Sequence, residues 1–132
     1  MSLDTFPLQE ALYSRLNGDG TLGGLVEGVF DGVPDDNTLP IVTLGEGTTT
    51  DNAMKDLDAR DYVFNIDVYS SYRGMKETKN IMQRVYDLLH DHSLSVSGAN
   101  LITLRCEFTT QVIEGDGVIR HGIMRFRAFI TD

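Results

Sequence analysis

Residues 61–90 read DYVFNIDVYSSYRGMKETKNIMQRVYDLLH, and the spacing of apolar residues changes once within this stretch. Up to position 69 apolar and polar side chains alternate, which places Tyr62, Phe64, Ile66 and Val68 on one side. A period of two is typical of a strand with one buried face. From position 75 onward apolar residues recur every three or four positions, so we expect an amphipathic helix of about 17 residues that packs on the strand's apolar face.

The C-terminal third of the chain predicts a β-hairpin. Residues 101–112 alternate, and residues 118–131 alternate again after the turn sequence Glu-Gly-Asp-Gly at positions 114–117. In this arrangement Arg125 and Arg127 lie across from the region of Glu107 on the solvent face. The side chains expected to point inward are Ile102, Leu104, Cys106, Phe108, Met124, Phe126, Ala128 and Ile130.

The N-terminal half is less regular. Leucines at helical spacing predict a short helix over residues 7–17, with Gly18 where helices commonly stop. Short apolar runs predict strands at residues 26–30 and 41–44. Residues 48–59 are polar and have no period, so we expect a mobile loop there.

The order of these elements predicts an α+β fold. A mostly antiparallel sheet of four to five strands would have its apolar face covered by the two helices, both packed on that one face. A chain of 132 residues is the size of one ordinary domain, and we expect a single domain over residues 1–132.

Charge and cysteine usage narrow the classes of partner. Twenty acidic and 11 basic residues give a net charge of −9, which disfavours tight binding of nucleic acid or anionic lipid. Cys106 is the only cysteine, so no intramolecular disulfide can form and a reducing compartment is the natural interpretation. No stretch has the apolar length of a signal peptide or membrane span. We therefore expect synthesis and assembly in the cytoplasm and no membrane association.

The search for chemical motifs yields no catalytic, cofactor-binding or metal-binding residues. His90 and His92 point in different directions on a helix, and His121 stands alone in a strand. The glycines near position 20 follow a helix instead of opening one, so they do not form a phosphate loop. Neither serine nor cysteine has a base nearby in sequence, and the carboxylates near the long loop lack a calcium-binding pattern: Asp51, Asp56, Asp58 and Asp61. The chain is predicted not to be an enzyme.

The layout as a whole resembles the tail-completion, or tail-terminator, proteins of long-tailed phages and gene transfer agents. The resemblance is carried by the N-terminal helix ending near Gly18, the strand entry Leu39-Pro40-Ile41-Val42, the strand at residues 62–71 that leads through Arg73-Gly74 into a helix, and the C-terminal hairpin. It covers nearly the whole chain, although none of these features is a chemical motif.

Similarity to this family implies a structural subunit that caps the tail tube at its head-proximal end and forms the head–tail joining interface. The implied assembly is a homo-oligomeric ring, with a hexamer favoured, whose partners are the tail tube protein and a head–tail connector protein. DNA would pass through the ring without being gripped. The subunit would assemble in the host cytoplasm and reside in the neck of the mature particle.

Two exposed polar segments are the candidate subunit or tube interface: the long loop and the hairpin tip. Their residues are Thr49, Asp51, Met54, Lys55, Asp58, Glu114 and Asp116. Turn chemistry is an alternative explanation for Glu114 and Asp116. Alternative functions are a head-side connector or stopper protein and, more distantly, a small ligand-binding domain or an enzyme.

Overall fold

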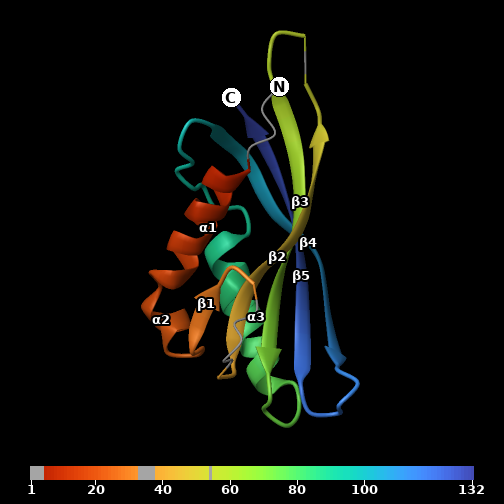
Figure 1. Cartoon of the computed structure of the whole chain (residues 1–132). Helices are drawn as coiled ribbons and strands as arrows, with labels where there is room; N and C mark the ends of the chain where they lie inside the picture. Colours follow the sequence, from red (N-terminus) through yellow and green to blue (C-terminus); the bar gives the residue numbers. More distant parts are fainter. Residues whose placement is uncertain (1–4, 33–37, 54) are drawn as a thin grey trace.

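The computed structural model describes residues 5–32, 38–53 and 55–132, and they form an α+β fold (Figure 1). One five-stranded sheet has the strand order β1-β2-β3-β5-β4, and all neighbours are antiparallel except β1 and β2. The strands are β1 (Gly28–Phe30), β2 (Ile41–Asp51), β3 (Ala59–Ser70), β4 (Asn100–Ile113) and β5 (Arg120–Thr131). The helices are α1 (Phe6–Asn17), α2 (Gly20–Gly23) and α3 (Lys76–Leu89). The predicted fold class is confirmed.

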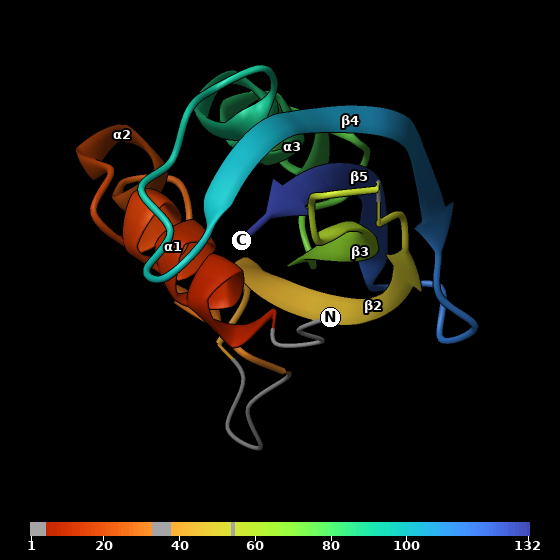
Figure 2. The same ribbon diagram turned by 90° about the horizontal axis from the view of Figure 1, so that it is seen from above.

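The helices lie together on one side of the sheet (Figure 1). Seen from above, the sheet is strongly twisted, with β2 and β4 on opposite sides of the central β3 and β5 (Figure 2). The hydrophobic core fills the space between the helices and the inner face of the sheet, because each element turns its apolar side toward it. The largest fully buried side chains include Leu8, Leu12, Leu16, Leu22, Ile66, Ile81, Leu89, Leu104, Met124, Phe126 and Ile130.

Helix α3 confirms the expected amphipathic helix, at 14 residues instead of about 17. It ends at Leu89 because His90 has extended backbone angles and Asp91 has a positive φ of 58°, which an α-helix cannot include. The residues at helical spacing face the core, where Thr78, Ile81, Met82, Val85, Leu88 and Leu89 are buried.

The central strands confirm the alternation of β3 and β5. Phe64, Ile66 and Val68 of β3 are buried, and their neighbours on the other face are partly exposed. The rings of Phe64 and Phe126 stack across the two strands with centroids 5.7 Å apart. This contact joins the two strands at the centre of the core.

Strand β2 is longer than the sequence predicts. The loop expected over residues 48–59 is wrong in its first part, because Thr48, Thr49, Thr50 and Asp51 pair with β3 from Val63 to Arg60. β-Branched threonines favour a pleated strand once a partner is present. The connection proper therefore spans residues 52–58, of which residue 54 lies outside the described part.

A bulge between Leu44 and Gly47 interrupts β2. At Gly45 a Cβ atom would come within 2.5 Å of the Asp67 carboxylate, and at Gly47 it would overlap the ring of Tyr62. Glycine is thus required at both positions because β3 approaches closely. These two glycines interrupt the apolar pattern of the strand, which is why the sequence predicted that the strand would end at position 44.

Strand β4 departs from the predicted alternation. Ile102 and Phe108 were expected to point inward, yet their side chains are 54% and 48% exposed. Two register shifts, one between Leu101 and Thr103 and one between Cys106 and Phe108, add a residue each and turn the following side chain to the other face. Leu104 and Cys106, between the shifts, do face the core.

Helix α1 confirms the predicted N-terminal helix, with Leu8, Leu12 and Leu16 buried. The short strand β1 confirms part of the one expected at residues 26–30 and adds a parallel edge to β2. The four-residue helix α2 is an addition that the glycine-rich sequence did not indicate. It begins after Asp19, whose side chain accepts the N–H of Leu22 at 2.8 Å.

Candidate interaction surfaces

The connection between β2 and β3 projects beyond the body of the sheet (Figure 1). Lys55 and Asp58 are exposed there, Asp51 is exposed at the end of β2, and Thr49 is half-buried within β2. Met54 lies outside the described residues. The structure therefore places Lys55 and Asp58 on a hairpin tip and Thr49 and Asp51 on the strand that leads to it.

The β4–β5 turn is organised by its own acidic residues. Oδ1 of Asp116 accepts the backbone N–H groups of Val118 and Ile119 at 2.8 and 3.1 Å. These two hydrogen bonds favour the charged form and lower the pKa of Asp116. Gly117 follows with φ +73°, a conformation that suits glycine. Turn chemistry thus accounts for Asp116.

Glu114 takes part in a cluster that the sequence did not predict. His121 lies between two carboxylates, with Nδ1 2.8 Å from Glu114 Oε1 and Nε2 2.8 Å from Asp67 Oδ1. Its ring stacks on that of Tyr69 at 4.3 Å between centroids. Burial, followed by the two carboxylates, raises the pKa of Tyr69. His121 therefore does more than the ordinary cross-strand residue we expected: it fixes the turn to the outer face of the sheet.

The two predicted interface segments lie at opposite ends of the sheet. Ala59, which follows the β2–β3 tip, pairs with Thr131, whereas Ser70 at the other end of β3 pairs with Arg120 beside the β4–β5 turn. Twelve strand residues separate the ends by about 37 Å. The structure does not bring these segments together, so they form two separate surfaces.

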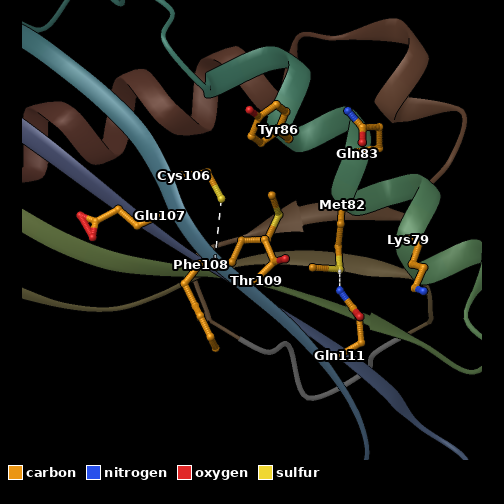
Figure 3. Close-up of a pocket in the computed structure, with 10 residues that line it drawn as sticks. Lys79, Met82, Gln83, Tyr86, Cys106, Glu107, Phe108, Thr109 and Gln111 are labelled. Carbon is orange, nitrogen blue, oxygen red and sulfur yellow. Dashed lines mark hydrogen bonds between the residues drawn. The ribbon is translucent and has the colours of Figure 1, made fainter.

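A groove opens between α3 and the second half of β4 (Figure 3). It has a volume of about 450 Å³. Met82 and Tyr86 of α3 line one wall, and Cys106 and Gln111 of β4 line the other. Gln111 Nε2 contacts Met82 Sδ at 3.7 Å across the groove. Phe108 points away from α3 on the opposite side of β4 (Figure 3). The bulge that creates this geometry has no signature in the sequence.

His90, considered above as a metal ligand, has structural contacts. Its ring stacks on Tyr86 with centroids 4.4 Å apart, and Nδ1 accepts the backbone N–H of Cys106 at 3.0 Å. Within residues 5–32, 38–53 and 55–132, no three His, Cys, Asp or Glu side chains are grouped as metal ligands would be. Over the same residues, no helix is both long enough and apolar enough to cross a membrane.

An ion pair on the outer face confirms one cross-strand expectation. Arg127 of β5 donates to Glu107 of β4, and both side chains are partly exposed. This contact raises the pKa of Arg127, because the charged guanidinium is the form that the carboxylate binds. Beside it, the guanidinium of Arg125 lies 5.3 Å from the centre of the Phe108 ring.

Exposed apolar side chains on an edge strand, such as Phe108, Val112 and Ile113 of β4, are a feature of surfaces that contact other chains. Comparison with known proteins defines the class further. The family model "Tail completion protein gp17" matches residues 10–131. The chain therefore belongs to the family of tail completion proteins gp17, a structural family with a role in phage tail assembly, and it is not an enzyme.

Two solved structures that this chain resembles belong to a gene transfer agent and a bacteriophage. A chain from the virion of a native gene transfer agent particle is 25% identical, with all of both chains covered and a TM-score of 0.92. The gp17 protein of bacteriophage SPP1 is 24% identical over 96% of this chain and 91% of that one, with a TM-score of 0.69. A search of curated proteins found no match.

Proposed function

We propose that this chain is a subunit of a homo-oligomeric ring that caps the tail tube at its head-proximal end and joins the tail to the head. The observation that supports this most is the likeness, over the full length of both chains, to a chain of an assembled gene transfer agent virion. The partners are then the tail tube protein and a head–tail connector protein. We favour a hexamer, formed in the host cytoplasm and retained in the neck of the particle.

The net charge of the chain supports a ring through which DNA passes without being bound. The net charge of −9 makes the surface repel phosphate, so DNA would pass through the ring without being held. The hydrophobic cluster joins side chains from α1 to β5, which supports the chain acting as a single domain.

The two hairpin ends are the proposed contacts with partners. At one end lie Thr49, Asp51, Lys55 and Asp58, and at the other lie Glu114 and Asp116. Met54, which lies outside the described residues, is proposed as a contact from its place in the sequence. Because the ends are separated by the length of the sheet, each would meet a different neighbour along the axis of the tail. The internal bonds of Glu114 and Asp116 make that end rigid, and rigid ends lose less entropy on association.

The decisive experiment is electron microscopy of particles from a strain that lacks this gene. Overlong or ragged tails unattached to filled heads are expected, since nothing would stop tube growth. Tails of normal length beside tailless or leaking heads would instead indicate a head-side connector or stopper. Normal particles would contradict both assignments and favour a ligand-binding role.

A second experiment tests the β2–β3 tip alone. Replacing residues 53–58 with Asn-Gly, a sequence suited to a two-residue turn, shortens the tip and leaves Asn52 opposite Ala59, so the pairing of Asp51 with Arg60 is kept. We expect an unchanged melting temperature and particles that fail to join. The matched control removes exposed charges elsewhere, in Glu10→Ala with Asp87→Ala. Joining of heads and tails by the shortened variant at the control level would show that this tip is not a contact.

A further inference from the structure

The second half of β4 is an open sheet edge. No described residue pairs with the backbone of residues 107–113 on the side away from β5. The first half differs, because the N–H of Asp91 donates to the carbonyl of Leu104 at 2.8 Å and His90 accepts the N–H of Cys106. These contacts engage the edge at Leu104 and Cys106, just before the second bulge, and the edge is open beyond it. A row of unpaired N–H and C=O groups can bind another strand.

The open half of β4 is also apolar. The exposed fractions of Phe108, Val112 and Ile113 are 48%, 40% and 54%. Directly beneath this half lies the groove that Met82 and Tyr86 of α3 line (Figure 3). A strand added to this edge would cover the exposed apolar side chains and direct every second residue of its own toward the groove. An apolar edge of this kind is normally covered by a partner.

A second open edge lies on the other side of the same sheet. β1 pairs only with residues 41–43 of β2. Residues 47–51 pair regularly with β3 on one side, and no described strand covers their other side. Figure 2 shows β2 and β4 on opposite sides of the central strands. The chain therefore has two open edges of similar length, five residues on β2 and six, residues 108–113, on β4.

The charges around the open part of β2 are mostly acidic. Glu46 and Asp51 flank it, and the adjoining hairpin tip carries Asp56 and Asp58 beside Lys55. The open half of β4 has charges of both signs: the basic side chains Lys79, Arg120 and Arg125, and the carboxylates Glu107 and Glu114. Its basic side chains can therefore face the acidic β2 edge of another copy.

Strand direction is compatible with such pairing. Within the sheet β2 and β4 run in opposite directions, because each of the three steps from β2 through β3 and β5 to β4 is antiparallel. Copies that share one strand direction thus bring β4 against the next β2 in antiparallel orientation.

The two open edges lie at different heights along the sheet. Thr49 lies opposite Tyr62, and Thr110 lies opposite Ile123, which pairs with Asp67. The two edges are therefore offset by five residues of β3, about 17 Å. Pairing would stagger the copies, as strands are staggered in a closed barrel.

We propose that residues 108–113 of one copy pair with residues 47–51 of the next copy, forming a sheet that continues from subunit to subunit. The inference rests on the proposed function, because it names the surface through which the ring would close. The association is heterologous: each copy uses a different edge toward each neighbour, which closes a ring when the rotation between copies permits.

Disulfide cross-linking in assembled particles tests the pairing. In a Cys106→Ser background, Thr110→Cys is combined with Thr48→Cys or Thr50→Cys, whose side chains face the same side of the sheet as Thr110. Within one chain the two positions are separated by three strand spacings, about 14 Å, and by the offset along the strands, which is too far for an internal bond. The control combines Thr110→Cys with Ser14→Cys on exposed α1. We expect linked oligomers to form about tenfold faster than in the control, since pairing raises the effective concentration.

A charge substitution gives an independent test. Val112→Glu places a carboxylate on the open edge, where it would face the acidic β2 edge of the next copy, and Val118→Glu places the same charge in the turn, where the parent side chain is also exposed. Both variants should fold with wild-type melting temperatures, and Val112→Glu alone should reduce ring occupancy of particles, by about tenfold or more.

Electron microscopy of the wild-type particles separates the two possible failures. The edge pairing is overturned if rings form normally without cross-links and if Val112→Glu is incorporated as well as Val118→Glu. That result leaves the proposed function standing. Absence of any ring from wild-type particles contradicts the proposed function itself and overturns the pairing with it.

Discussion

Arg84 on α3 holds Asp19, 65 residues earlier, through two parallel hydrogen bonds, Nε to Oδ2 at 2.9 Å and Nη2 to Oδ1 at 2.7 Å. The same carboxylate caps α2 by accepting the N–H of Leu22. Bidentate Arg–carboxylate pairs combine charge with fixed geometry. This contact therefore fastens the glycine-rich N-terminal segment to the longest helix.

Substitution of Asp19 should lower the melting temperature, and the size of the decrease should depend on which contacts of Asp19 are lost. Asp19→Asn keeps an oxygen that can cap α2 but loses the ion pair, and Asp19→Ala loses both contacts, so the melting temperature should fall further in Asp19→Ala. Thermal unfolding followed by circular dichroism measures this. Glu10→Gln, which changes an exposed carboxylate on α1, is the control. Equal melting temperatures for all three variants would contradict the assigned role.

The stabilisation by Asp19 should depend on pH in a defined window. Hydrogen bonding to Arg84, and then to the Leu22 N–H, lowers the pKa of Asp19 from 3.8 to about 2. A carboxyl whose pKa is lower in the folded state stabilises fully above its unfolded value and progressively less as pH falls toward the folded one. The difference in melting temperature between wild type and Asp19→Asn should therefore narrow between pH 3.8 and about 2. A difference independent of pH throughout this window would refute the assignment.

Gly47→Ala should destabilise the fold by about 1 to 3 kcal/mol, because the new Cβ overlaps the ring of Tyr62. Gly115→Ala, where a Cβ meets nothing within 4 Å, should stay within about 0.5 kcal/mol of wild type. Urea unfolding at equilibrium gives both values. Equal stability of the two variants would contradict the prediction, because it would mean that the ring of Tyr62 can move aside for the new Cβ atom.

Two phenylalanines test the assignment of faces on the hairpin. Phe126→Ala removes a fully buried ring and should cost about 3 to 5 kcal/mol. Phe108→Ala removes a half-exposed ring whose described ring contact is with Arg125, and should cost about 1 kcal/mol or less. Denaturant titration of the isolated chain compares the two free energies of unfolding. A large loss for Phe108→Ala would support the inward orientation that simple alternation predicts.

The sequence predicted well those elements that have one face in solvent and the other in the hydrophobic core. On β3 and β5 every second residue meets the core, so the period of two survives from Phe64 to Val68 and from Met124 to Ile130. Helix α3 likewise shows its buried stripe directly. In these elements local pattern and tertiary environment agree.

The sequence-based predictions fail where a β-bulge adds a residue to a strand, or where the contacting side chains come from strands that are distant in the sequence. On β4 the two bulges reverse the faces of Ile102 and Phe108, and a bulge depends on backbone pairing, which the order of side chains does not reveal. On β2 the glycines concealed a strand because their role is to admit Asp67 and Tyr62 from β3. The His121 cluster joins three elements that sequence spacing cannot relate. Of the residues assigned to the two interface segments, Lys55, Asp58 and Asp116 are exposed, whereas Thr49 is half-buried within β2. The separation of the two segments emerged only from the strand register.

The placement of the two hairpins at opposite ends of β3 and β5 gives the subunit a built-in polarity. In a ring of equally oriented subunits, one face of the ring would carry the β2–β3 tips and the other face the β4–β5 turns. Such a ring could bind between its two neighbours in the particle in only one orientation. The ends are also modular, because the register of twelve residue pairs between β3 and β5 holds them apart. Exchanging one hairpin for that of a relative would then alter which neighbour is recognised on one side and leave the other side unchanged.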